Sequence, residues 1–228
     1  MVLDATYRST NNGWFNNTYS LFGIIGKGGT VKNVALTGVE FDLTNTGGGG
    51  TISKAVCSPI ATWIVSGATV ENVYVSLKGT NYFSDGNTYM AGFACGVDVG
   101  ATLNNIVVDD TYVVTDGDGL VDASAMQKRG SFVYRKMAQQ ATTETSWTNV
   151  VVISTRALAG AETNKYDASN ITELATGYVN MPNTYRYASV DAWKTAQAND
   201  TMKPNVDGFG STYWRLVNGV PVWGKDEN

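Results

Sequence analysis

The chain contains no histidine among its 228 residues. Serine and cysteine nucleophiles commonly rely on a neighbouring imidazole as general base, and imidazole is among the commonest zinc ligands. The absence of histidine therefore excludes Ser-His-Asp and Cys-His catalysis and argues against zinc. Catalysis by carboxylates is the chemistry that remains open.

Cysteine is scarce, with only Cys57 and Cys95. Each lies in a string of small and apolar residues, AVCSP and FACGV. The two residues could form one disulfide, but such strings favour two buried thiols that fill small core positions. No metal-binding spacing is present, and we expect no cofactor.

Long apolar runs are also absent, since none approaches the ~20 residues of a membrane-spanning helix. The first stretch, MVLDATYRSTNNGW, has neither the basic nor the apolar region of a signal peptide. Only 16% of the residues are charged, which is common among extracellular β proteins. We therefore expect an exported protein that lacks its own signal. It would be either a fragment of a longer surface protein or part of a virus particle released by lysis.

The 16 basic and 20 acidic residues give a net charge of −4 without long runs. This balance gives no indication of a phosphate-binding surface, so we expect no nucleic acid as a partner. Apolar residues make up 43% of the chain, which indicates a globular protein. The abundance of Gly, Thr, Asn and Val favours β-structure with many turns.

One short pattern occurs four times, as GGTVKNVAL, GATVENVYV, GATLNNIVV and, more weakly, TSWTNVVVI. The copies share the asparagines Asn33, Asn72, Asn105 and Asn149, which follow one another at intervals of 39, 33 and 44 residues. Repeats of ~20–50 residues are typical of solenoids and arrays. The unequal intervals indicate a constant core with loops of variable length.

A strand-like segment precedes each copy, and a further one often follows it. The preceding segments are residues 21–26, 55–65, 92–100 and 130–137, and the following ones are residues 39–43, 74–77 and 111–114. Apolar residues alternate with polar ones and should point inward. Like strands would then stack about 4.8 Å apart in parallel sheets. The predicted fold class is all-β, a parallel β-helix.

The string FGIIGKGGTVKNVALTG resembles the glycine-rich repeats of right-handed parallel β-helix surface proteins, which include GLUG-type repeats and pectin-lyase-like solenoids. The resemblance covers roughly residues 19–158 and implies a right-handed coil. It implies little about function, because this fold hosts adhesins, phage tail spikes, lyases and glycosidases.

The repeated asparagines have two interpretations. They could form a stacked ladder at a sharp corner, where asparagine tolerates a left-handed backbone and its amide satisfies backbone groups. Alternatively, they could form a row of exposed amides that bind sugar hydroxyls. The apolar residues on both sides favour the structural ladder.

The sequence predicts three regions, namely an N-terminal docking arm (residues 1–18), the β-helix (19–158) and a C-terminal α+β cap (159–228). The cap would contain a short helix with Ser189 as its N-cap and a hairpin with Asn218 in its turn.

Two tryptophans of this region, Trp214 and Trp223, would cover the last rung of the β-helix, whose strands would otherwise be exposed. A small independent module is the alternative for this segment.

Carboxylates are the candidates for catalysis, because glycoside hydrolysis needs two of them about 5–9.5 Å apart. If the protein is an enzyme, Asp98, Asp109 and Asp110 would supply the pair from adjacent rungs. Asp116 and Asp118 resemble a fragment of a calcium loop, but the closing glutamate is missing. Asp-Gly strings such as this one are more typical of plain turns, and Asp122 follows them.

A loop between two repeat copies is the candidate for binding. It contains Tyr82, Phe83, Asp85, Asn87 and Tyr89. Aromatic faces with neighbouring amides and a carboxylate suit sugar rings and also protein interfaces. Alternatively, these rings pack back on the coil.

These features predict a non-enzymatic structural and recognition protein on a virion (phage tail, fibre or capsid surface) or a bacterial cell surface. Its expected partners are host glycans or other surface proteins, and a homo-oligomer is possible by analogy with phage β-helices. The alternative function is a polysaccharide depolymerase that uses the paired aspartates.

Overall fold

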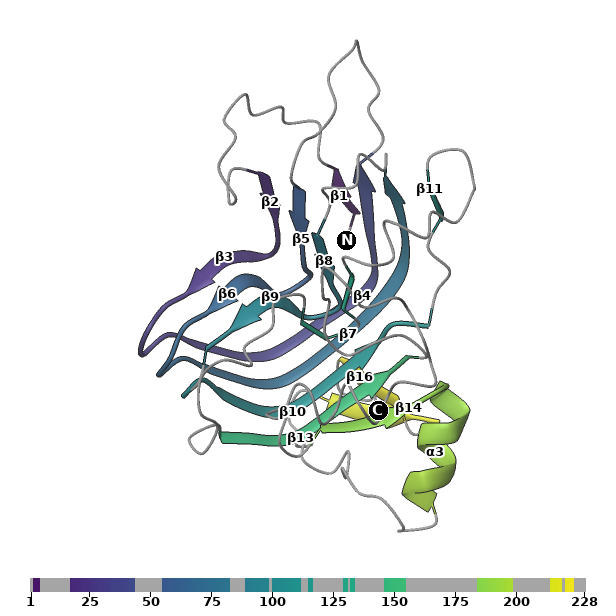
Figure 1. The fold of residues 1–228 in the computed structure, drawn as a ribbon. Helices are drawn as coiled ribbons and strands as arrows, with labels where there is room; N and C mark the ends of the chain where they lie inside the picture. Colours follow the sequence, from purple (N-terminus) through teal and green to yellow (C-terminus); the bar gives the residue numbers. More distant parts are fainter. Residues whose placement is uncertain are drawn as a thin grey trace, which may run out of the picture.

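The computed structural model describes residues 2–4, 17–43, 55–82, 89–98, 100–111, 115–116, 129–130, 132–133, 146–154, 184–198, 214–218 and 220–223. This part of the chain is mostly β-sheet with one short helix, as the sequence predicted for the fold class. Its strands form three parallel sheets and one antiparallel hairpin (Figure 1).

Sheet A is the largest sheet and contains the four repeat copies. Its order is β1-β4-β7-β10-β13-β14, with β11 paired to β7. The strands are Val2–Asp4 (β1), Thr30–Leu43 (β4), Thr69–Tyr82 (β7), Thr102–Asp109 (β10), Thr115–Asp116 (β11), Ser146–Ile153 (β13) and Thr184–Tyr187 (β14). All neighbours are parallel and the copies are in register, so that Val70 pairs with both Val31 and Leu103.

Two smaller parallel sheets, B and C, accompany sheet A. Sheet B has the order β12-β8-β5-β2 and sheet C the order β3-β6-β9. Their strands are Asn17–Tyr19 (β2), Phe22–Ile25 (β3), Ala55–Cys57 (β5), Ala61–Ile64 (β6), Tyr89–Ala91 (β8), Ala94–Val97 (β9) and Arg129–Gly130 (β12). The chain passes from sheet B to C to A three times, as β2-β3-β4, β5-β6-β7 and β8-β9-β10.

The core is formed by apolar side chains from all three sheets. In the second copy, Val70, Val73 and Val75 are fully buried, whereas Val31 and Val34 of the first copy are only partly buried. A copy in the middle is covered by a neighbour on each side, and the first is not. Burial of each valine stabilises the fold by roughly 1.5–3 kcal/mol.

The corners between sheets C and A have a constant length. Residues 26–29, 65–68 and 98–101 make these connections with four residues each. Gly28, Gly67 and Gly100 lie in the left-handed region with φ of 76°, 79° and 84°. The N–H of Gly28 donates to the carbonyl of Gly67, and that of Gly67 to the carbonyl of Gly100, at 2.9 Å each. Glycine is needed here because the left-handed backbone conformation is less stable by roughly 1–2 kcal/mol for residues that carry a Cβ.

The two cysteines are free and buried, which confirms the prediction of core thiols. The thiol of Cys95 donates to the carbonyl oxygen of Cys57 at 3.6 Å. Burial raises the pKa of Cys95 to about 12, so its thiol stays protonated at neutral pH.

The predicted helix and hairpin of the C-terminal segment are both confirmed. Helix α3 spans Val190–Ala198, and the N–H of Ala192 donates to Oγ of Ser189 at 3.1 Å, as expected for an N-cap. Strands β15 (Trp214–Val217) and β16 (Val220–Trp223) pair antiparallel, and Asn218 in their turn has a φ of 53°.

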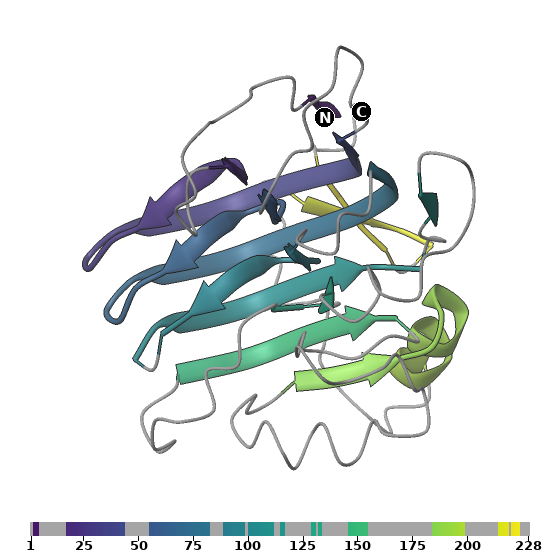
Figure 2. The ribbon, with the colours of Figure 1, turned by 45° about the horizontal axis from the view of Figure 1, so that its top comes forward.

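The position of this segment differs from the predicted cap over the last rung. Trp214 is buried against outward-facing side chains of sheet A, among them Tyr74, Val107 and Val151. The hairpin therefore lies along the outer face of the sheet (Figure 2). The outer face carries this apolar column, which needs cover from water. The side chain of Trp223 lies outside the described residues.

Sheet A also extends further along the chain than the repeat copies. Sheet A continues past residue 158 with β14, in which Thr184 pairs with Val150 and Arg186 pairs with Val152. Val150 and Val152 face the core, so the same positions of β14 carry a polar and a charged residue. Strand β14 lacks the apolar alternation of the copies, so the sequence pattern did not indicate it.

Candidate functional site

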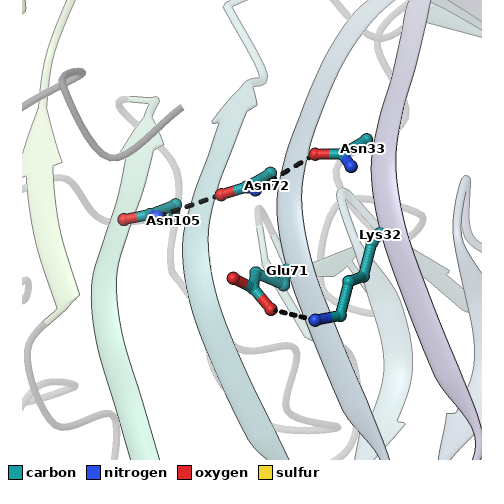
Figure 3. A network of polar contacts seen from close by, with 5 residues as sticks. All are labelled: Lys32, Asn33, Glu71, Asn72 and Asn105. Carbon is teal, nitrogen blue, oxygen red and sulfur yellow. Dashed lines mark hydrogen bonds and ion pairs between the residues drawn. The ribbon is translucent and has the colours of Figure 1, made fainter. Parts of the chain in front are cut away.

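Four asparagines form a continuous row within sheet A. Their φ angles are 57° for Asn33 and 54° for Asn72, Asn105 and Asn149. Nδ2 of each later asparagine donates to Oδ1 of the preceding one, at 3.0, 3.0 and 2.9 Å along the row. Figure 3 shows the first three members.

The row interrupts the backbone ladder at one position in each copy. Lys32 pairs with Glu71 and Val34 with Val73, while the asparagines between them are left out of the register. Asparagine suits this position because it tolerates the left-handed backbone and its amide is both donor and acceptor. Lys32 and Glu71 also form an ion pair of 2.9 Å, which is exposed and contributes at most about 1 kcal/mol.

The asparagine side chains are largely engaged by one another. Asn72 and Asn105 use both the donor and the acceptor of their amides within the row. Asn33 uses only its oxygen there, so its amide N–H groups have no asparagine partner among the described residues. Asn33 is therefore the member of the row whose amide N–H groups donate to no other asparagine among the described residues.

A groove of about 610 Å³ lies beside the Asn33 end of the row. It separates the outer face of sheet A from strand β16 of the hairpin. Its lining comes from β4 (Asn33, Val34, Ala35, Thr37), β7 (Tyr74, Ser76) and β16 (Val220, Pro221, Val222). We call it the hairpin groove.

A β-bulge shapes the floor of the hairpin groove. The register between β4 and β7 shifts after Leu36, and Gly38 has a φ of 62°. The N–H of Gly38 donates to Oγ of Ser76 at 3.1 Å. Bulges re-aim side chains and are frequent next to binding sites. Here the bulge leaves Thr37 exposed at the groove.

Tyr74 is the aromatic residue of the groove and is mostly buried. Burial raises its pKa to about 12, the carboxylate of Asp109 adds to this rise, and a hydrogen bond with Ser76 opposes it. The phenol therefore remains a neutral donor at physiological pH.

Asp98, one of the three catalytic candidates, has a structural environment. Its Oδ1 accepts a hydrogen bond from Nε1 of Trp63 at 2.9 Å, and its Oδ2 accepts one from the backbone N–H of Ser66 at 3.3 Å. It lies at the corner before β10, whereas Asp109 is the last residue of that strand. The structure thus places Asp98 at the opposite end of β10 from the other two candidates.

Asp109 and Asp110 are adjacent but differ in environment. Asp110 is fully buried, with one oxygen 3.5 Å from the hydroxyl of Ser154, and its charge acts on Arg186. Asp109 is partly exposed and accepts a hydrogen bond from Thr111 at 2.9 Å. Burial raises the pKa of Asp109, with a further rise from Asp110. Neither Asp109 nor Asp110 lines the hairpin groove.

Arg186 is a residue whose role sequence reasoning missed. Its Nε donates to the backbone carbonyl of Ser154 at 2.8 Å. Burial lowers the pKa of the guanidinium, and the nearby Asp110 carboxylate raises it. Arg186 pairs with core residue Val152, so it is a polar end to the inward-facing row of valines that contains Val108 and Val152. No local pattern around Arg186 signals this placement.

The remaining predicted sites fall mostly outside the described residues. Phe83, Asp85, Asn87, Asp118 and Asp122 lie outside them, as do the side chains of Tyr82, Tyr89 and Asp116. The backbone register nevertheless pairs Asp116 with Tyr82. In the part of the chain that is described, no group of three or more acidic or cysteine residues is arranged to hold a metal ion.

The connections from sheet A to sheet B share one edge of the protein, which we call the variable edge. Adjacent strands of sheet A end there at Leu43, Tyr82 and Asp116, and adjacent strands of sheet B begin at Ala55, Tyr89 and Arg129. The intervening segments, residues 44–54, 83–88 and 117–128, differ in length, unlike the four-residue corners. The predicted binding loop is one of these segments.

No protein-family model, curated protein or solved structure matches this sequence. Within the described residues, no helix has the length and apolar character needed to cross a membrane.

Proposed function

We propose that the three parallel sheets form one continuous right-handed β-helix. The repeated circuit from sheet B to C to A, the in-register copies and the constant glycine corners support this architecture. A connection between parallel strands of one sheet is right-handed in about 98% of cases, which favours the right-handed form.

We infer that this β-helix serves as a structural and recognition element on a virion or a bacterial cell surface. The observation that carries the proposal is the variable edge, where segments of unequal length leave a scaffold whose corners between sheets C and A are all four residues long. Loops held by a rigid scaffold are the usual location of binding residues. The expected partners are host glycans, other surface proteins or further copies of this chain.

The experiment replaces Tyr82 and Phe83 of the variable edge with alanine and measures attachment to the target surface or a glycan array. Binding should weaken while the circular dichroism spectrum and the unfolding midpoint stay the same. The matched control is Thr148→Ala, at an exposed position of sheet A away from this edge. Unchanged binding by the Tyr82→Ala/Phe83→Ala protein would refute the role of the edge.

We propose that the protein binds its target surface and does not hydrolyse polysaccharide. The depolymerase alternative requires two carboxyl groups that face one substrate. Asp110 is fully buried, and Asp98 is engaged by Trp63 and Ser66. A reducing-sugar assay separates the two functions, because release of sugar ends by the wild type and not by Asp109→Asn would establish the enzyme.

A further inference from the structure

We propose that the hairpin groove is a binding site for a neutral saccharide unit. The groove lies on the outer face of sheet A, away from the variable edge, so the inference does not rest on the proposed function of that edge. Its volume of about 610 Å³ falls within the roughly 300–1,000 Å³ of small-molecule sites.

The groove lies where a column of outward-facing side chains on sheet A begins with a small residue, Ala35. Ala35, Tyr74, Val107 and Val151 occupy equivalent outward positions on β4, β7, β10 and β13. The last three are buried under Trp214 and its neighbours, whereas Ala35 is partly exposed. A tyrosine or valine at position 35 would fill the space that alanine leaves.

The two walls of the groove differ in polarity. Strand β16 supplies an apolar wall of Val220, Pro221 and Val222, and sheet A supplies amide and hydroxyl groups. The amide N–H groups of Asn33 have no asparagine partner, and no hydrogen bond joins the hydroxyl of Thr37 to another described residue. A sugar ring has an apolar C–H face and hydroxyl groups that both donate and accept, which matches these walls.

The charges favour a neutral ligand over an anionic one. None of the described residues that line the groove is cationic, so a carboxylate or phosphate would have no cationic partner among them. The carboxylate of Asp109 acts on the lining, because its charge raises the pKa of Tyr74. On the sheet A side, β4 and β7 pair with each other and offer no free edge between them to an added peptide strand.

The experiment titrates the full chain with maltotriose, cellotriose and chitotriose, with trigalacturonate as the anionic comparison. Binding is followed by NMR shifts of the backbone amides of Thr37 and Ser76. We expect at least one neutral trisaccharide to bind and trigalacturonate to bind at least about tenfold more weakly, a difference of about 1.4 kcal/mol.

Two variants locate the site. Ala35→Tyr fills the groove and should weaken binding by at least about tenfold, and Thr37→Val should weaken it several-fold by removing one hydroxyl at constant size. Thr148→Tyr adds the same ring at an exposed position of sheet A and should bind as the wild type does. If Ala35→Tyr fails to fold, Thr37→Val alone decides.

The proposal is overturned if no neutral trisaccharide binds at roughly millimolar concentration. It is also overturned if trigalacturonate binds more tightly, or if the groove variants bind as the wild type does. The variable-edge variant Tyr82→Ala/Phe83→Ala should retain trisaccharide binding. The two proposals can therefore fail separately.

Discussion

Replacing Asn105 with alanine removes two hydrogen bonds from the centre of the asparagine row and places alanine in a left-handed backbone. The backbone φ of 54° costs alanine roughly 1–2 kcal/mol. Two amide hydrogen bonds, of 3.0 Å to Asn72 and 2.9 Å from Asn149, are also lost, at about 1 kcal/mol each. We expect Asn105→Ala to lower the free energy of unfolding by roughly 3–4 kcal/mol.

The matched control is Asn218→Ala, in the exposed turn of the hairpin. Asn218 has a φ of 53° but does not belong to the row, so its replacement should cost only the backbone part, roughly 1–2 kcal/mol. Asn105→Gly relieves the backbone and loses the hydrogen bonds, so it should still cost about 2 kcal/mol.

Urea unfolding followed by circular dichroism measures all three variants. If the losses for Asn105→Ala and Asn218→Ala agree within about 0.5 kcal/mol, the hydrogen-bonded row contributes no stability and the reasoning is refuted.

Three further perturbations have defined outcomes. Gly96→Ala should lower the free energy of unfolding by roughly 1–3 kcal/mol and change tryptophan fluorescence, because a Cβ there would overlap the ring of Trp63; an unchanged midpoint would contradict this packing. Ser189→Ala should cost about 1 kcal/mol through the lost N-cap, whereas Ser189→Asp should not, in thermal unfolding of both variants. Burial raises the pKa of Asp109, so its carboxylate lowers stability as pH rises through that raised value. Asp109→Asn should therefore be more stable than the wild type at neutral pH, and this gain should vanish below a pH of about 3.9; a constant difference between pH 3 and 7 would refute the shift.

Much of the fold could be predicted because its determinants are local and repeat. A left-handed backbone requires glycine or asparagine, so Gly67 and Asn72 recur at fixed spacing in the copies. Alternation placed Val70 and Val73 in the core, and the short signals at Ser189 and Asn218 gave the helix and the hairpin. Each of these features is visible within a few residues of sequence.

The position of the C-terminal segment could not be predicted in the same way. Sequence patterning marks Trp214 as a residue that needs burial but does not indicate which apolar surface it covers. Tyr74 and Val107 read as ordinary strand residues, and their outward column becomes apparent only when the copies are aligned in register. The hairpin groove depends on this placement and on the small side chain of Ala35, so the sequence alone did not reveal it.

The burial and the hydrogen-bond partners of the candidate catalytic aspartates depend on tertiary contacts and not on residue type. Asp109 and Asp110 occupy consecutive positions, but only Asp110 is fully buried, beside Ser154. Asp98 accepts a hydrogen bond from Trp63, 35 residues earlier in the chain. Partners this far apart in sequence come together only through the stacking of the copies.

The most direct test of the central claim, that the repeat copies stack in register around one core, is an NMR measurement of nuclear Overhauser effects between copies. Stacking predicts cross-peaks from the side-chain amide protons of Asn105 to Asn72, and from the methyl groups of Val73 to those of Ile106. The absence of both sets of cross-peaks in the folded protein would contradict the account.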